Sequence, residues 1–321
     1  MRCPGQRKRC PGQGWVAGLR VRCEEHAFQP GIRAVHSSFG MIEAASYGAY
    51  APKGILRLAI EWTRSLPDTW LARRAVILVR RFVLRRLRGA PVDAEALGVR
   101  MRLVPYNNIC EKRMLFTPQT FDATELAILA ANIREGFVFI DVGANVGAYS
   151  LFVASRAGPA ARILAIEPQP EIFERLIFNI RLNAIPTVKA IDCAVAEKAG
   201  EVTLFLDPHN AGESSLKVVS SSGAKPIRVA ARTLLDLIEA EAYPRVDAIK
   251  LDVEGAEDLI LEPFLARAPS HLLPKILILE NGALRWQADL SRLLADSGYG
   301  LKATTRQNLV FERKDGDASH G

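Results

Sequence analysis

The residues with the clearest chemical purpose follow the first strongly apolar run of the chain. Residues 137–142 are typical of a buried strand, and Asp141 lies near its end. The turn after it carries, in order, Gly143, Asn145 and Gly147. Ligands in an open parallel sheet bind beyond the carboxyl ends of the strands. Since glycines let the backbone approach a ligand and a helix start attracts anionic groups, this turn is a candidate ligand-binding loop.

The glycine spacing selects among ligands. A dinucleotide site requires G-x-G-x-x-G, but Asn145 stands where the middle glycine would be. The phosphate-loop pattern G-x-x-x-x-G-K-[ST] is also absent. Asp141 would repel a pyrophosphate, whereas it suits a ligand that carries an ammonium group. S-adenosylmethionine has an ammonium, a carboxylate and a sulfonium, so it is the expected cofactor.

Two further acids end the next two predicted strands. Glu167 ends the strand 162–167, 24 residues after Gly143, where a carboxylate can accept hydrogen bonds from both ribose hydroxyls. The alternative for Glu167 is an acid at a helix N-terminus that interacts with the macrodipole. Asp192 lies near the end of the strand 187–193, where an adenine would lie. It can accept from the adenine amino group, or it can be a solvated acid at a strand end.

A cluster of charged residues follows the fourth predicted strand, 246–252. Strand alternation puts Lys250, Asp252 and Glu254 on one side. A hydroxyl acceptor must lose a proton, and a nearby carboxylate or lysine can act as the base. The alternatives are that the acids bind the acceptor, hold Mg²⁺ or cap the next helix. We predict catalytic roles for these three residues and a substrate contact for Glu257, and we assign no residue to a metal.

Three other residues are candidates for contact with the acceptor. Glu280 ends the fifth predicted strand, 275–280, and faces the same side as the charged cluster. Asn210 and Ser214 belong to a polar turn between two short predicted strands. A plain hairpin turn that contains Asn and Gly is the alternative for this segment.

The elements that must position these residues alternate between short apolar runs and helical patterns. This alternation predicts a doubly wound, mostly parallel seven-stranded sheet with helices on both faces. The sheet strands are expected at 137–142, 162–167, 187–193, 246–252, 275–280, 300–305 and 308–313. An additional pair of strands is expected at 201–206 and 226–230. Helices are expected at 122–134, 147–156, 170–183, 232–241, 256–266 and 286–297.

The chain divides into four predicted parts. These are a disordered leader at 1–40, a basic helical segment at 41–98 that ends in a linker at 89–98, the main domain at 99–314 and a disordered tail at 315–321.

The basic segment contains two predicted helices that are separated near Pro67 and Asp68. The second helix, residues 70–88, has seven arginines and no acid. On a helical projection most of these arginines share one arc, and Leu71, Leu78 and Phe82 fall outside it. The helix can therefore dock on an anionic membrane surface, or it can pack its apolar side on the main domain.

Charge and cysteine content limit the possible partners. The net charge of +7 belongs to the N-terminal third, because residues 101–321 hold 24 basic and 28 acidic residues. This balance disfavours a nucleic-acid partner. No apolar run reaches membrane-spanning length, and the first 40 residues lack a secretory signal pattern. Few cysteines lie in the main domain, so we expect a reducing cytoplasm, with peripheral contact to the inner membrane surface as an option.

Several of these motifs together resemble one known family. The stretch 141–150 (DVGANVGAYS), Glu167-Pro168, Asn179, Asn183 and the stretch 249–257 (IKLDVEGAE) are similar to FkbM-type methyltransferases. The resemblance covers roughly residues 115–313. It implies a class I methyltransferase fold of Rossmann-like type, here with an N-terminal helical extension. It also assigns cofactor roles to Asp141, Gly143, Asn145, Gly147 and Glu167.

The implied activity is O-methylation, most often of a sugar, a glycan or another small natural product. The turn at 210–215 resembles the family's N-x-G-x-[ST]-S stretch. One rival function is methylation of a protein or nucleic acid. The other is a non-catalytic subunit that binds S-adenosylmethionine. Cofactor binding without turnover on a broad acceptor panel would favour the second rival.

Overall fold

The computed structural model describes residues 45–206, 214–215, 225–282 and 285–314, which belong to one compact unit. The predicted leader, the predicted tail and Asn210 lie outside the described residues. None of the described helices combines the length and the apolar character needed to cross a membrane.

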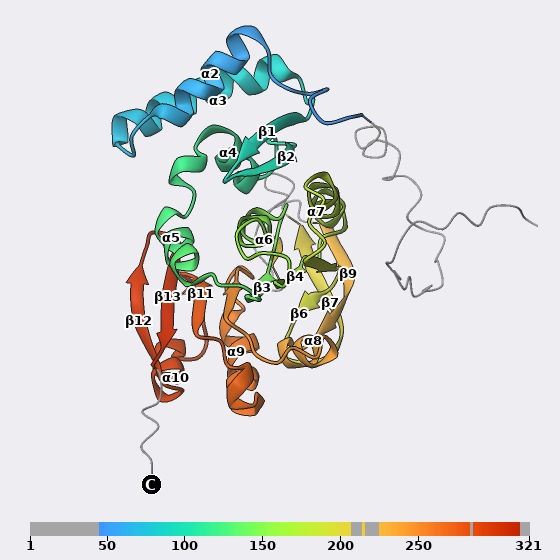
Figure 1. Cartoon of the computed structure of the whole chain (residues 1–321), viewed down its shortest axis with the longest axis vertical. Coiled ribbons are helices and arrows are strands. Elements are labelled where there is room, and N and C mark those ends of the chain that lie inside the picture. The colour runs from blue at the N-terminus through green and yellow to red at the C-terminus, as the bar shows by residue number, and fades with distance from the viewer. Residues whose placement is uncertain (1–44, 207–213, 216–224, 283–284, 315–321) are drawn as a thin grey trace, which may run out of the picture. The chain divides into compact units, whose positions relative to one another are not determined.

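A mostly parallel sheet forms the centre of the unit (Figure 1). Within the described residues it has seven strands in the order β12-β13-β11-β10-β3-β4-β5. All neighbours are parallel except β13, which is antiparallel to both β11 and β12. The strands are β3 (Val138–Val142), β4 (Arg162–Ile166), β5 (Val188–Ile191), β10 (Ala248–Leu251), β11 (Ile276–Glu280), β12 (Tyr299–Thr304) and β13 (Asn308–Arg313). The predicted fold class is confirmed, and each strand lies within two residues of its expected ends.

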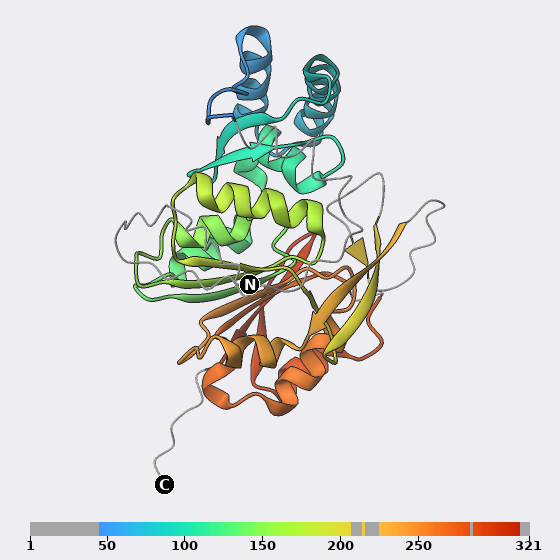
Figure 2. The same ribbon diagram turned by 90° about the vertical axis from the view of Figure 1, so that its right-hand side faces the viewer.

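Helices cover both faces of this sheet, as Figure 2 shows. One face packs against α5 (Ala123–Asn132), α6 (Ala148–Ala154) and α7 (Pro170–Leu182). The other packs against α8 (Leu234–Ala240), α9 (Glu257–Arg267) and α10 (Leu290–Asp296). Short 3-10 turns occur at Pro118–Thr120 and Ser270–Leu272. Because both sides of each central strand are buried, the strands read as continuous apolar runs.

The alternation of the central strands decides where polar side chains emerge. Phe139 faces the α5–α7 layer and Ile140 faces the α8–α10 layer. Asp141 therefore lies on the α5–α7 side, and the register places it beside Lys250 of β10. Lys250 in turn pairs in register with Ile278 of β11. Asp141 and Lys250 therefore lie together at the carboxyl edge of the sheet. This is the edge at which ligands bind in open parallel sheets, at the point where the strand order reverses.

A smaller sheet follows β5 in the chain. Its order is β6-β9-β7-β8 within the described residues, with β6 (Ala194–Val195), β7 (Gly200–Leu206), β8 (Ser214–Ser215) and β9 (Lys225–Arg232). The predicted additional pair corresponds to β7 and β9, which are antiparallel along their whole length. Strands β6 and β8 were not expected, since two residues carry no periodic signal.

The N-terminal part contains the two expected helices, α2 (Gly54–Ser65) and α3 (Trp70–Leu87). Thr69 caps α3, because its Oγ1 accepts a hydrogen bond from Ala72 N at 3.3 Å. Residues 89–98 were expected to be a linker, and this is wrong. They contain β1 (Val92–Ala96), which pairs with β2 (Val99–Leu103) as an antiparallel hairpin. Helix α4 (Ile109–Phe116), also not expected, follows the hairpin.

A buried arginine ties this hairpin to the main domain. The Arg102 Nε lies 2.7 Å from Asp93 Oδ1, and both side chains are almost fully buried. The Arg102 backbone N–H donates to Asn179 Oδ1 on α7 at 2.9 Å. Asn179 Nδ2 donates to the carbonyl of Val146 at 3.1 Å. The hairpin is therefore hydrogen-bonded, through α7, to the loop after β3.

This arrangement predicts that Arg102→Met lowers the free energy of unfolding by about 3–5 kcal/mol, because Asp93 would keep a buried charge without its cationic partner. Among the described residues, only the backbone N–H groups of Gly48 and Tyr50 would be left to this carboxylate. Urea unfolding of the purified protein measures the loss. The control is Arg100→Met on the same strand, whose exposed contact with Glu95 at 3.8 Å is worth about 0–1 kcal/mol. Equal losses in both variants would contradict the structural role of the buried pair.

Candidate active site

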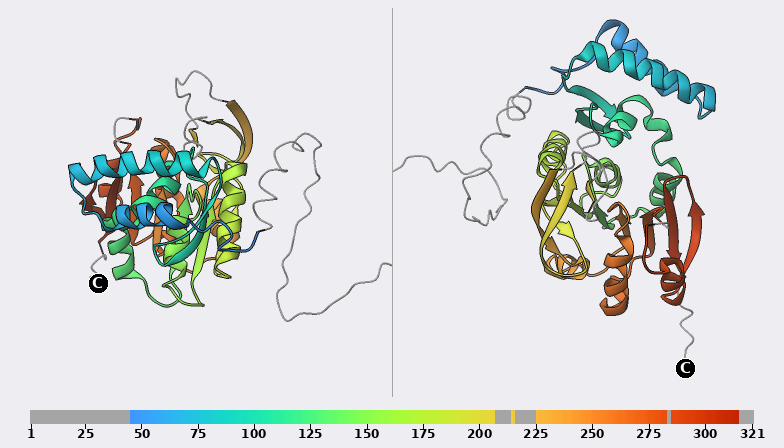
Figure 3. Two further views of the ribbon diagram at one scale, coloured as in Figure 1. Left: turned by 90° about the horizontal axis from the view of Figure 1, so that it is seen from above. Right: turned by 180° about the vertical axis from the view of Figure 1, so that it is seen from behind.

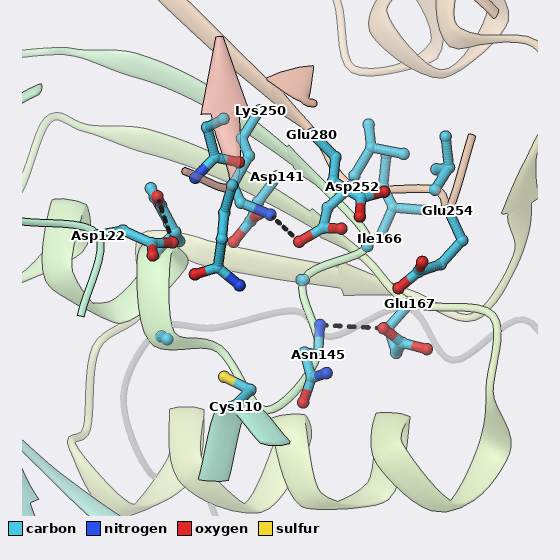
Figure 4. Close-up of a pocket in the computed structure, with 18 of the residues that line it drawn as sticks. Cys110, Asp122, Asp141, Asn145, Ile166, Glu167, Lys250, Asp252, Glu254 and Glu280 are labelled. Carbon is cyan, nitrogen blue, oxygen red and sulfur yellow. Dashed lines mark hydrogen bonds and ion pairs between the residues drawn. The ribbon is translucent and has the colours of Figure 1, made fainter. Parts of the chain in front are cut away.

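A pocket of about 280 Å³ opens at the carboxyl ends of β3, β4 and β10 (Figure 4). The structure brings most of the predicted site residues into its wall. Those that line it are Asp141, Gly143, Asn145, Glu167, Lys250, Asp252, Glu254 and Glu280.

Glu167 is held at the pocket wall by backbone donors. Its Oε2 accepts from Asn145 N at 2.9 Å, and its Oε1 accepts from Gln169 N at 3.0 Å. Burial raises its pKa to about 7, although these two hydrogen bonds act in the opposite direction. The carboxylate is fixed in place while its remaining lone pairs stay available to a ligand.

Asp141 is buried at the end of β3. Its Oδ2 accepts from the backbone N–H of Ser150 at 3.0 Å and from the Ser150 hydroxyl at 2.7 Å. Its Oδ1 is buried and has no hydrogen-bond partner among the residues that the structure describes. Burial raises the pKa of Asp141, and the charge of Lys250 opposes that rise. A buried acceptor of this kind is satisfied when a ligand donates to it.

Lys250 carries a buried positive charge between two acids. Its Nζ donates to Asp252 Oδ2 at 2.7 Å and lies 5.0 Å from the centre of the Tyr149 ring. Burial alone would lower the pKa of Lys250, but Asp252 and Asp141 together raise it. The ammonium therefore stays protonated at neutral pH, and Lys250 is poorly suited to act as a base.

Asp252 also belongs to a group of three carboxylates, with Glu254 and Glu280 (Figure 4). One oxygen each of Asp252, Glu254 and Glu280 can be chosen so that all three lie within 4.8 Å of one another. Arg285 bridges two of them, at 3.1 Å from Glu254 and 2.8 Å from Glu280. Burial raises the pKa of Glu280, and the charge of Asp252 adds to the rise. This group can accept hydrogen bonds from a polyhydroxylated molecule, or it can hold a divalent cation.

The pocket also contains groups that the sequence did not single out. Asp122 accepts a hydrogen bond from the Tyr149 hydroxyl at 2.9 Å and pairs with Arg113 at 2.8 Å. Burial, followed by the charge of Asp122, raises the pKa of Tyr149, which remains a neutral donor. Tyr149 lies inside the conspicuous loop motif, whereas nothing in the sequence marks Asp122.

Cys110 also lines the pocket, and burial raises the pKa of its thiol, which disfavours a nucleophilic role.

The two loop glycines also have a packing role. A Cβ on Gly143, whose φ is +75°, would lie 2.1 Å from the carbonyl oxygen of Asp252. A Cβ on Gly147, at φ +92°, would lie 2.8 Å from Leu176 Cδ1, and Gly147 does not line the pocket. Both glycines therefore let the loop pack against the end of β10 and against α7, and only Gly143 is also placed to approach a ligand.

The structure does not bring two of the predicted contact residues into the pocket. Asp192 is exposed and does not line the pocket, because β5 ends at Ile191 and the chain continues past it with Cys193 in the wall. Glu257 is fully buried outside the pocket. Its carboxylate accepts from Val253 N, Gly255 N and Trp286 Nε1, so it holds the turn after β10 and is not free to contact a substrate. The side chain of Ser214, like Asn210, lies outside what the structure describes.

The remaining geometry fits S-adenosylmethionine. The Asp141 Oδ1 can accept from the ammonium of the methionine part. Glu167, at the end of the next strand, can accept from the ribose hydroxyls, as acids at this position do in related nucleotide-binding sheets.

Comparison with known proteins finds similarity to methyltransferases in sequence. Residues 141–299 match the methyltransferase FkbM domain. Methyltransferase sdnD of Sordaria araneosa is 32% identical over 178 residues, which are 46% of this chain and 65% of that protein, slightly less than two thirds of its length. Hexuronic acid methyltransferase AglP of Haloferax volcanii is 24% identical over 195 residues, which are 60% of this chain and 77% of that protein. Among solved structures, TYW2 of M. jannaschii in complex with AdoMet is 13% identical, with a TM-score of 0.38, over 70% of this chain and 88% of that chain.

The electrostatics of the pocket lead to a prediction for Lys250→Met. Asp141 would lose its counter-charge, so we expect a loss of about 3 kcal/mol in the free energy of unfolding at neutral pH. The substitution raises the already raised pKa of Asp141 further. Since a neutral Asp141 carries no penalty, the loss should shrink as the pH falls.

Urea unfolding over a pH series tests this expectation. Adding Asp141→Asn to Lys250→Met removes the unpaired charge and should restore part of the stability. A loss that is independent of pH, or a double variant less stable than Lys250→Met, would show that the ion pair is not the cause.

Proposed function

Residues 141–299 belong to the FkbM methyltransferase family, and from this premise we propose that the chain transfers a methyl group from S-adenosylmethionine to a hydroxyl oxygen of a sugar, a glycan or another small natural product. One observation carries the proposal. The carboxylate of Asp252 is partly exposed in the pocket and is held by the buried Lys250, beside the two acids suited to the cofactor.

Two acids of the pocket would hold the cofactor. Glu167 would accept from the ribose hydroxyls, and Asp141 would accept from the methionine ammonium through its buried Oδ1. Bound there, S-adenosylmethionine supplies a sulfonium methyl group that passes to the acceptor oxygen as the carbon–sulfur bond breaks. Asn145 keeps Glu167 in position through its backbone N–H, and its side-chain Oδ1 accepts from Asn108 at 2.8 Å.

Asp252 is the proposed base. It accepts the proton of the acceptor hydroxyl as the oxygen forms its new bond to carbon, and it becomes a neutral acid. Lys250 stays charged and orients Asp252, so it acts as a positioning residue. Glu254 and Glu280 bind other hydroxyls of the acceptor and hold the reacting oxygen in line.

The pocket is suited to an acceptor that carries hydroxyl groups. The oxygens of Asp252, Glu254 and Glu280 lie close together, and hydroxyls can donate hydrogen bonds to them. The similarity to a protein named as a hexuronic acid methyltransferase supports a sugar as the carrier of that hydroxyl.

Transfer of label from S-adenosylmethionine tests the proposal directly. We expect labelled products of sugar or polyol character when the protein is incubated with small-molecule and glycan extracts of the source organism. Label in protein or nucleic acid would replace the proposed acceptor class. Cofactor binding by calorimetry with no transfer across the panel would instead identify a non-catalytic subunit.

The raised pKa of Glu167 predicts how cofactor affinity depends on pH. Ribose hydroxyls donate to the ionised carboxylate, so binding lowers a pKa that is about 7 in the free protein. Affinity for S-adenosylhomocysteine should therefore be constant above this pH and should fall below it, by up to about tenfold per pH unit. Glu167→Gln should weaken binding by about 1–3 kcal/mol and flatten the profile.

Calorimetry over a pH series measures both effects, with Glu239→Gln on the opposite face of the sheet as the control. If Glu167→Gln binds like the wild type, then Glu167 is not the ribose ligand.

The proposed base gives a second prediction. Asp252→Asn should lower kcat by roughly 10²–10⁴ and leave cofactor affinity almost unchanged, because Asp141 and Glu167 carry that role. If the carboxylate only orders the turn after β10, kcat should stay at the wild-type value. If the three acids hold a metal, a chelator should abolish wild-type turnover and Mg²⁺ should restore it. Measurements of kcat, dissociation constant and melting temperature with and without chelator separate these outcomes.

A further inference from the structure

The two N-terminal helices expose an unusual amount of apolar surface. Six large apolar side chains on α2 and α3 are 47% to 65% exposed, namely Ile55, Leu58, Trp62, Trp70, Leu71 and Leu78. On α2 the first three recur at spacings of three and four, which places them on one side of the helix. The opposite side packs inward through Ile60 and Thr63. Exposed apolar groups that share a face mark a surface that binds something.

Helix α3 has the same division into an inner and an outer side. Ala72 and Val83 are buried, and Val76 and Val79 pack against the core. Leu71 and Leu78, which the helical projection places outside the arginine arc, are 64% and 65% exposed, so they do not pack on the main domain. Phe82 is also 38% exposed.

Arginines are interleaved with these outward apolar groups. Arg74, Arg81 and Arg85 are exposed and lie at helical spacings from Leu78, so they share its side of α3. The Arg74 guanidinium stacks over Trp70 at 4.9 Å. No described acidic residue pairs with Arg81 or Arg85, and α3 contains no acid. The outer side of α3 is therefore apolar and cationic along its whole length.

The outer sides of α2 and α3 form one surface. The helices contact each other, and they lie side by side beyond the β1–β2 hairpin, as the left view of Figure 3 shows. Their inner sides face the hairpin and α4, where Arg64 of α2 donates to the carbonyl of Leu115 at 2.8 Å. We call the outward side of this pair the α2–α3 face.

We propose that the α2–α3 face docks on an anionic phospholipid bilayer, with both helices lying flat on its surface. Basic amphipathic helices bind in this way, with their apolar side chains at the boundary between headgroups and acyl chains and their cations at the phosphates. Tryptophans such as Trp62 and Trp70 are suited to that boundary because they combine an apolar ring with a polar N–H.

Charge and apolarity together distinguish the bilayer from other occupants. A symmetric contact with a second copy would bring the two sets of Arg74, Arg81 and Arg85 toward each other. A nucleic acid would neutralise the arginines but would leave Leu71 and Leu78 without apolar contacts. An anionic bilayer satisfies both kinds of side chain. The inference does not depend on the proposed methyl transfer.

Co-sedimentation of the full chain with vesicles tests the proposal. We expect binding to phosphatidylcholine vesicles that contain phosphatidylglycerol, weaker binding to phosphatidylcholine alone, and release at high salt. Arg74→Gln, Arg81→Gln and Arg85→Gln together should weaken partitioning by about a hundredfold. Leu71→Ser with Leu78→Ser should also weaken it. The matched controls are Arg292→Gln on α10 and Leu301→Ser on β12, both exposed, which should bind like the wild type.

Three results would overturn the proposal. One is equal partitioning of the wild type and the triple arginine variant, which would place any vesicle binding elsewhere on the chain. Another is the absence of wild-type binding to either kind of vesicle. The last is a dimer in light scattering, formed without vesicles and lost in the leucine variant, which would assign the α2–α3 face to a second copy. Circular dichroism of each variant confirms that the helices remain folded.

Discussion

The site depends on one buried ammonium between two carboxylates. Asp141 and Lys250 lie on neighbouring strands in register, on the same face of the sheet, and Lys250 reaches Asp252 at 2.7 Å. A buried carboxylate such as Asp141 is costly in the absence of a counter-charge. The register of β3 and β10 supplies that charge, so the same strand pairing that forms the core also fixes the polar groups of the pocket. A substitution of Asp141 or Lys250 is therefore expected to change both the stability of the fold and the polar groups of the pocket.

The loop after β3 connects the pocket to other parts of the fold through hydrogen bonds. Its backbone holds Glu167 through Asn145, and its carbonyl at Val146 accepts from Asn179, which also binds the backbone of Arg102. The pocket therefore rests on hydrogen bonds from β4, α7 and the β1–β2 hairpin. Preorganised groups of this kind keep their geometry without a ligand, which favours tight and selective binding. The N-terminal hairpin belongs to this framework, although α2 and α3 expose a face that points away from it.

Much of this could be predicted from the sequence, for reasons that also explain the errors. The seven strands were recognisable because burial on both faces makes apolar runs. The loop motif marked Asp141, and the position at the end of the next strand marked Glu167. Glu257 was misassigned because the strand alternation does not continue past Leu251, where Glu254 has a φ of +56° and α9 turns Glu257 inward. Asp122 was missed because it reaches the pocket through tertiary packing from a distant turn. For Leu71 and Leu78 the sequence left two alternatives, because apolarity alone cannot say whether a side chain packs inward.

The contact of Gly143 with β10 has a consequence for how such a protein can diverge. Because no side chain fits between position 143 and the carbonyl of Asp252, the loop after β3 and the residue directly after β10, which is the proposed base, are packed as one block. Mutations that retune acceptor choice by moving this block would disturb cofactor binding as well. The opposite wall of the pocket, which includes Ile109 of α4, Leu204 of β7 and Arg306 between β12 and β13, has no such restriction. New acceptor specificities are therefore expected to arise by variation of that wall around a constant block.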